Sequence, residues 1–243
     1  MVHGALASRS YWHSNLEALS TVCTPVVVEL WGHGKSPSPI EPSTYEPIAY
    51  AEQFELIRSE LGAERWFTIG QSMGAALTLQ YGLLHPGAVI AQVVTNSSSA
   101  FADPTIWLER NLTAIAKIAA GVEEGGMATL VDSWINPGRS RRVVQPTRDM
   151  LIAEFNEHTA AGVIGGFRHT NRSCPLGERV VDVSRPTLLT NGIAEPAFQD
   201  KLPAAQRIPG IEIVEVDASH AVNAQNPPDW NDAVVEFLGR HTP

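Results

Sequence analysis

Short runs of apolar and β-branched residues alternate along this chain with longer segments whose apolar positions recur at helical spacing. Five such runs are predicted to be β-strands, at residues 25–29 (PVVVE), 66–70 (WFTIG), 89–95, 187–190 (TLLT) and 211–216. Helices are predicted at residues 47–61, 73–84 and 230–240. Strands that alternate with helices are typical of a parallel sheet covered by helices, so the pattern predicts an α/β fold.

A long segment between the strands at 89–95 and 187–190 interrupts this alternation. Residues 101–178 are predicted to form several amphipathic helices, separated by glycine and proline breaks. Because this insertion is too long for a simple crossover, we expect a helical lid over the carboxyl edge of the sheet, where such folds bind ligands. The predicted core then consists of residues 1–100 and 179–243. Plain scaffold helices remain an alternative for the insertion.

Composition restricts the classes of partner. The 243 residues suit one large domain, and 44% hydrophobic residues are enough for a sizeable core. The net charge of -9 disfavours nucleic acid and anionic lipid surfaces. The sequence has no apolar run long enough to span a membrane and no signal-peptide pattern, which predicts a cytoplasmic protein. Cys23 and Cys174 lie far apart and are predicted to be reduced thiols.

The clearest chemical signal is the run GQSMG at residues 70–74, between a predicted strand and a predicted helix. In a G-x-S-x-G turn of this kind, the flanking residues must be small because the chain turns so tightly. The strained turn raises the serine oxygen clear of the sheet and points the next backbone N–H at a developing oxyanion. Ser72 is therefore predicted to be a nucleophile rather than an idle residue in a glycine turn.

A serine hydroxyl needs a general base, and that base needs an acid to orient it. His220 follows the last predicted strand, where its side chain can extend over the carboxyl edge of the sheet and reach Ser72. The other seven histidines fall in turns, helix ends, the insertion or the terminal segments. With no HExxH motif and no cluster of His and Cys, the sequence predicts no metal.

The order of Ser72, an acidic residue and His220 resembles that of the α/β-hydrolase family. Three flanking motifs carry the same resemblance: the oxyanion loop HGA at 3–5, the turn ELWGHGKS at 29–36 and the strand PTLLTNG at 186–192. The resemblance covers the whole chain except the lid. It implies an α/β-hydrolase fold, with a mostly parallel sheet flanked by helices.

The resemblance also implies roles for individual residues. Ser72 is the nucleophile, and His220 acts first as general base and then as general acid. The backbone N–H groups of Ala5 and Met73 form the oxyanion hole, which contributes several kcal/mol, roughly, to lowering the barrier. Side-chain identity at these two positions therefore matters little.

The triad acid departs from the family pattern. The usual aspartate after residue 192 is absent, and Glu195 follows three residues later. Glutamate can hold the imidazole in one tautomer and stabilise its cation, so Glu195 is the predicted acid. Asp103, near the end of the strand at 89–95, and Asp200, further along the loop, are the alternatives.

The start of the chain is a second departure. In the family, an apolar strand leads directly into the His-Gly loop, whereas this sequence opens with Met1, Val2 and His3. The resemblance implies that upstream residues supply this strand and the hairpin before it. Without them, the strands at 25–29 and 66–70 face a gap that leaves backbone groups unpaired. Alternatively, residues 1–3 form a minimal strand, or the neighbouring strands close the gap.

These motifs imply a cofactor-free serine hydrolase that cleaves carboxylic esters, lactones or thioesters through an acyl-enzyme (EC 3, type 3.1.1). The implied partner is a small acyl substrate of apolar character, and the oligomeric state is open. A close alternative is hydrolysis of carbon–carbon bonds in diketone-like products of aromatic ring cleavage. Halide oxidation with peracids is the third alternative. A ligand receptor without turnover is the alternative of another class. The presence of Ser72, His220 and an acid favours an enzyme.

Overall fold

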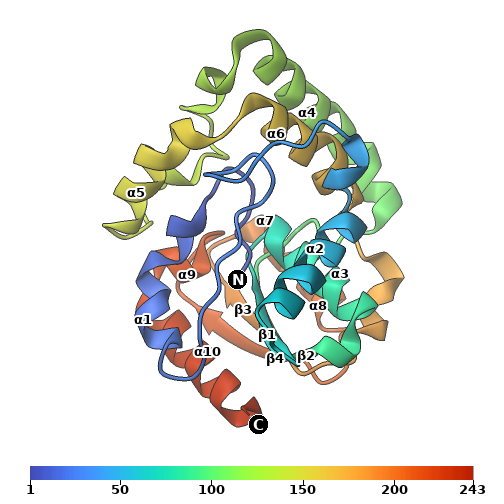
Figure 1. The fold of residues 1–243 in the computed structure, drawn as a ribbon, viewed down its shortest axis with the longest axis vertical. Helices are drawn as coiled ribbons and strands as arrows, with labels where there is room; N and C mark the ends of the chain where they lie inside the picture. The colour runs from blue at the N-terminus through green and yellow to red at the C-terminus, as the bar shows by residue number, and fades with distance from the viewer. Residues whose placement is uncertain (243) are drawn as a thin grey trace.

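Residues 1–242 are described by a computed structural model, and a parallel β-sheet lies at the centre of this part of the chain (Figure 1). Its four strands are β1 (Trp66–Gly70), β2 (Val89–Thr95), β3 (Thr187–Gly192) and β4 (Glu212–Val216). They lie side by side in this order, and all neighbours run parallel. The predicted α/β class is therefore confirmed.

The register places the ends of the four strands along one edge of the sheet. Gly70 pairs with Val94, Thr95 with Thr190, and Gly192 with Val216. Because the strands are parallel, the residues that follow each of them emerge together at this carboxyl edge.

The core helices match the predicted ones closely. They are α2 (Pro47–Glu60), α3 (Met73–Leu84) and α10 (Pro227–His241). Each of α2 and α10 begins with proline, whose fixed φ suits the first turn of a helix. Shorter helices complete the core: α1 (Leu16–Leu19), α7 (Pro196–Gln199), α8 (Leu202–Ala205), α9 (Val222–Gln225), η1 (Arg9–Asn15), η2 (Pro42–Tyr45) and η3 (Pro86–Ala88).

Helices cover both faces of the sheet because successive strand residues point to opposite sides. Val94 and Leu189 pack in one buried cluster with side chains of α2 and α3. Their neighbours Val93 and Leu188 pack in a second cluster with side chains of α1 and α10. Figure 1 shows these two pairs of helices on opposite sides of the sheet. None of the helices in residues 1–242 is both long and apolar enough to cross a membrane.

The insertion between β2 and β3 is helical, as predicted, and Figure 1 shows α4, α5 and α6 together on one side of the molecule. It has a small core of its own, which includes Ile115, Phe155, Val163 and Phe167 together with Leu6. Its elements are α4 (Pro104–Gly125), η4 (Met127–Leu130), η5 (Pro137–Arg139), α5 (Thr147–Glu154), η6 (Phe155–Glu157), α6 (Ala160–Gly165), the π-helical η7 (Gly166–Asn171) and η8 (Gly177–Asp182).

The prediction of a strand at residues 25–29 is wrong. In this segment only Val28 forms a β-bridge, and its partner is Val2. Val2 also bridges to Gly70, at the end of β1, and both bridges are parallel. A strand forms only where a neighbouring backbone pairs with it over several residues, and here the pairing involves Val2 alone. Val2 thus joins the two segments in the manner of the minimal strand named above.

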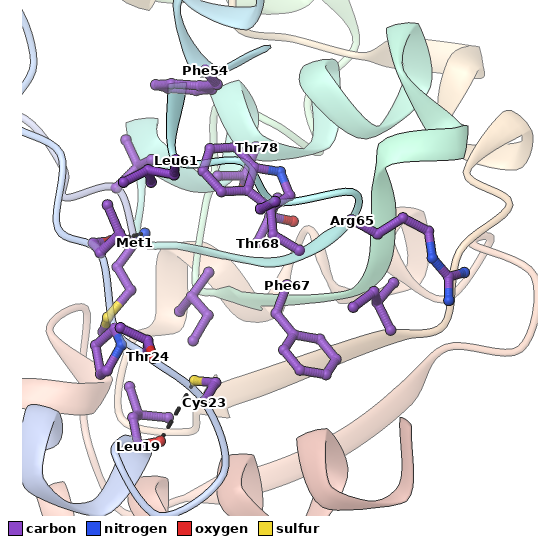
Figure 2. Close-up of a pocket in the computed structure, with 17 residues that line it drawn as sticks. Met1, Leu19, Cys23, Thr24, Phe54, Leu61, Arg65, Phe67, Thr68 and Thr78 are labelled. Carbon is purple, nitrogen blue, oxygen red and sulfur yellow. Dashed lines mark hydrogen bonds between the residues drawn. The ribbon is translucent and has the colours of Figure 1, made fainter. Parts of the chain in front are cut away.

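An apolar groove continues from this point between the segment at 23–26 and β1 (Figure 2). The Met1 amino group lies at its end and donates to the Val26 carbonyl at 2.7 Å. Burial of this amino group lowers its pKa to about 5.

Candidate active site

Ser72 lies between β1 and α3 on a strained turn, with φ 54° and ψ -118°. A Cβ atom added at Gly70 would lie 2.4 Å from the Gly74 carbonyl oxygen, and one at Gly74 would lie 2.2 Å from the Val2 carbonyl oxygen. Both positions therefore require glycine, because such distances are far inside van der Waals contact. Serine is held in a left-handed conformation by this tight packing, and its side chain is partly exposed.

The loop at residues 3–5 touches the turn directly. A Cβ atom at Gly4 would lie 2.9 Å from the Ser72 Cβ atom, so this close approach also requires glycine. Ala5 and Met73, the two predicted oxyanion donors, line one narrow void that has no room for a water molecule. His33, Val163, Gly166 and Phe167 complete its lining, and the last three belong to the insertion. The insertion therefore covers the space next to the turn.

His220 and Glu195 are brought together from the loops that follow β4 and β3. The His220 Nδ1 atom lies 2.8 Å from the Glu195 Oε1 atom. Since an ionised carboxylate only accepts hydrogen bonds, Nδ1 carries the proton and Nε2 is left as the acceptor in the neutral ring. Backbone bonds hold the two loops side by side, because Ile193 N donates to Val216 O and Ala194 N to Ala218 O.

The other Glu195 oxygen is held by Asn96, which the sequence reasoning did not identify. Asn96 is fully buried just after β2, and its Nδ2 atom donates to Glu195 Oε2 at 2.8 Å. The same side chain exchanges two hydrogen bonds of 2.9 Å with the backbone of Gly192. The residue after a predicted strand of a parallel sheet reaches the carboxyl edge, but this position alone does not distinguish a functional asparagine from any other residue there.

Two further polar side chains link the turn to this edge. Gln71 donates from Nε2 to the His220 carbonyl at 3.3 Å, and Ser97 donates to the Ser72 carbonyl at 2.7 Å. Both residues are buried. Gln71 thus ties the turn to the backbone of His220, and Ser97 ties it to the segment after β2.

The two alternative acids lie elsewhere. Asp103 is the N-cap of α4, where its carboxylate accepts from Thr105 N at 2.9 Å and Ile106 N at 3.0 Å. Asp200 is exposed at the end of α7. Within residues 1–242, the imidazole of His220 hydrogen-bonds to Glu195 and to neither of these carboxylates. The geometry therefore favours Glu195 among the three acids.

A serine on a strained strand-to-helix turn and a carboxylate–histidine pair at one edge of a parallel sheet define the α/β-hydrolase architecture. The profile described as alpha/beta hydrolase fold matches residues 1–227, and this chain belongs to that family. The same part of the chain that the structure describes holds no group of three or more His, Cys, Asp or Glu side chains placed for a metal ion.

Relatives align along nearly the whole chain. The chain is 24% identical over 253 residues to the sn-1-specific diacylglycerol lipase ABHD11 of Danio rerio. This alignment covers 98% of the chain and 77% of that protein. The structure of MenH from S. aureus superposes with a TM-score of 0.85 at 18% identity, covering 100% of this chain and 93% of MenH. The enol-lactonase from Burkholderia xenovorans LB400 superposes with a TM-score of 0.77 at 21% identity, covering 98% and 90%.

Proposed function

We propose that this protein is a serine hydrolase that cleaves a carboxylic ester, lactone or thioester through an acyl-enzyme at Ser72. The observation that carries the proposal is the 2.8 Å contact between His220 Nδ1 and Glu195 Oε1 at the sheet edge that also holds Ser72. This contact leaves Nε2 of His220 as the ring nitrogen that can accept a proton. Names of relatives support the reaction class, since they include a lipase and an enol-lactonase.

The proposed reaction gives each of these residues one role. His220 Nε2 takes the proton of Ser72 Oγ as that oxygen attacks the substrate carbonyl carbon. The backbone N–H groups of Ala5 and Met73 bind the oxyanion that forms. His220 then gives its proton to the leaving alcohol or thiol, and the acyl group stays on Ser72. Water repeats the sequence, with His220 as base, and releases the carboxylic acid.

The surroundings of Ser72 favour an apolar acyl group. The void beside Ala5 and Met73 is otherwise lined by Val163, Gly166 and Phe167, which carry no charge, and by His33. The void has no room for a water molecule as it stands, so an acyl chain must displace part of this lining. The apolar surface that the chain then contacts stabilises it by about 25 cal/mol per Å² buried. The substrate is therefore a small molecule with an apolar acyl part.

Labelling with a fluorophosphonate tests the nucleophile without knowledge of the natural substrate. The probe should attach to the protein, and mass spectrometry of a digest should locate it on Ser72. Ser98→Ala, three residues beyond β2, serves as the control and should label normally. A protein that stays unlabelled while it binds a ligand tightly is a receptor, and this outcome would contradict the proposal.

A substrate panel then separates the reaction types. Esters of graded acyl length, lactones, thioesters and a ring-fission dienone should be compared at equal concentration. Turnover of the esters, lactones or thioesters above the dienone is the expected result. Preference for the dienone would assign carbon–carbon hydrolysis to the same residues.

We expect the lid to select the acyl chain, and Gly166→Val tests this. A Cβ atom at Gly166 would lie 3.9 Å from its nearest neighbour, His33 Cε1, so the first added carbon makes no clash. The added methyl groups shorten the space for the acyl chain, and the ratio of kcat/KM for short over long esters should rise on the order of tenfold.

The matched control for the lid prediction is Gly121→Val, in α4 of the same insertion. A Cβ atom at Gly121 meets nothing within 4 Å, so this change adds the same volume away from the void. It should leave the chain-length ratio unchanged. Equal selectivity in both variants, with a lower Tm for Gly166→Val, would mark the insertion as scaffold.

A further inference from the structure

The backbone of the oxyanion loop is strained next to the proposed donor Ala5. Leu6 has φ 56°, and within residues 1–242 Leu6 and Ser72 are the non-glycine residues with positive φ. For a residue with a side chain, this conformation is strained. It persists only where surrounding groups hold it, so the contacts of Leu6 fix the path of the loop that carries the Ala5 N–H.

Two buried histidines hold the two polar backbone groups of Leu6. Leu6 N donates to His33 Nε2 at 3.2 Å, and His158 Nε2 lies 3.2 Å from the Leu6 carbonyl oxygen. A carbonyl only accepts, so His158 donates this bond from a protonated Nε2. Gly34 N donates to His158 Nδ1 at 3.0 Å, which fixes the same tautomer independently. Each nitrogen of His158 therefore has one assigned partner.

His158 belongs to the insertion, whereas Leu6 and Gly34 belong to the core. The residue after it, Thr159, donates from its backbone N–H to Gly32 O at 2.9 Å. Gly32 and Gly162 are so close that a Cβ atom on either would lie 2.2 Å from the Cα atom of the other. The insertion is thus fixed to the core at His158, and it reaches the oxyanion loop from this anchor.

We propose that His158 is a positioning residue that holds Leu6 in its left-handed conformation and thereby aims the Ala5 N–H at the oxyanion. This inference rests on the proposed hydrolase function. It couples the seating of the insertion to the completion of the oxyanion hole, because the bond from His158 exists only when the insertion is docked.

The surroundings of His158 keep its ring in the neutral form that both bonds need. Burial lowers the pKa of His158, and it lowers the pKa of the nearby His33 well below its usual value. Glu154, Glu157 and Glu29 act in the opposite direction on His158, but the effect of burial is larger. A protonated ring would turn an N–H at Nδ1 toward the Gly34 N–H and break that contact.

Two substitutions separate positioning from packing. His158→Phe keeps a ring of similar size against Phe155 and removes both hydrogen bonds, whereas His158→Gln keeps one acceptor and one donor. We expect His158→Phe to lower kcat about 10- to 100-fold with KM changed less than twofold, because loss of one oxyanion donor costs up to roughly 10³-fold in kcat. His158→Gln should restore most of kcat. His169→Phe, in the same insertion, is the control and should match the unchanged protein.

Each outcome decides one point. If the wild-type protein has no activity on any acyl substrate, the proposed function is overturned, whatever the variants do. An active protein whose His158→Phe form keeps its kcat, or whose His158→Gln form is as impaired as the phenylalanine form, overturns only the positioning role. If His158→Phe does not fold, His158→Leu replaces it. Nitrogen-15 NMR of the unchanged protein adds a direct check, since a His158 ring protonated at Nδ1 would overturn the proposal.

Discussion

Replacing Ser72 with alanine is expected to lower kcat by about 10⁴- to 10⁶-fold, the scale on which loss of a serine nucleophile acts. The fold should survive, since the hydrogen bonds that hold this residue within the described chain use its backbone carbonyl rather than its hydroxyl. Ser97, Ala75 and Ala76 all donate to that carbonyl. Alanine keeps these bonds and meets the same conformational strain at φ 54°.

Single-turnover and steady-state kinetics on the best ester of the panel measure this loss, with Tm as the check on folding. His220→Ala should be about as damaging, and the double variant should be little worse, because the two groups act as a unit. A Ser72→Ala protein that keeps a tenth of the activity with an unchanged Tm would contradict the acyl-enzyme mechanism. Catalysis would then have to proceed by direct attack of water.

The elements with strong local signals could be predicted from the sequence almost to the residue. The helix at 73–84 and the strands at 66–70 and 89–95 have the expected bounds, because apolar runs next to glycine and proline define them locally. Residues 25–29 carry an equally apolar pattern but form no strand, since pairing depends on what lies beside them. Local pattern thus predicts the capacity to form a strand, and the partner decides whether it forms.

The candidate site also contains residues with a local sequence signal and residues without one. Motif spacing pointed to Ser72 and His220 as candidates, and loop position pointed to Glu195, which the structure places next to His220. Asn96 and His158 were missed because their contacts join residues 99 and 152 positions apart in the sequence. An asparagine after a strand and a histidine in an insertion have no distinguishing pattern until the fold brings their partners to them.

Glu195→Gln is expected to lower kcat by about 10³- to 10⁴-fold by forcing the wrong tautomer of His220. The amide of Asn96 donates to Glu195 Oε2, and Asn96 cannot turn over, because its Oδ1 atom accepts from Gly192 N. In the variant, the side-chain oxygen of the new glutamine must therefore face Asn96, and its NH₂ group must face His220 Nδ1. That ring nitrogen then has to accept, so the ring proton moves to Nε2, where it blocks removal of the Ser72 proton.

Asp103→Asn is the matched control for this prediction. It makes the same change from carboxylate to amide and removes the same charge, and asparagine is as good an N-cap for α4 as aspartate. We expect kcat, KM and Tm of this variant to stay close to those of the unchanged protein. The measurement is kcat as a function of pH for both variants, because an inverted tautomer lowers kcat across the whole range rather than shifting the profile. If Asp103→Asn were the more damaging change, the acid would lie after β2, and the contact between Glu195 and His220 would be structural only.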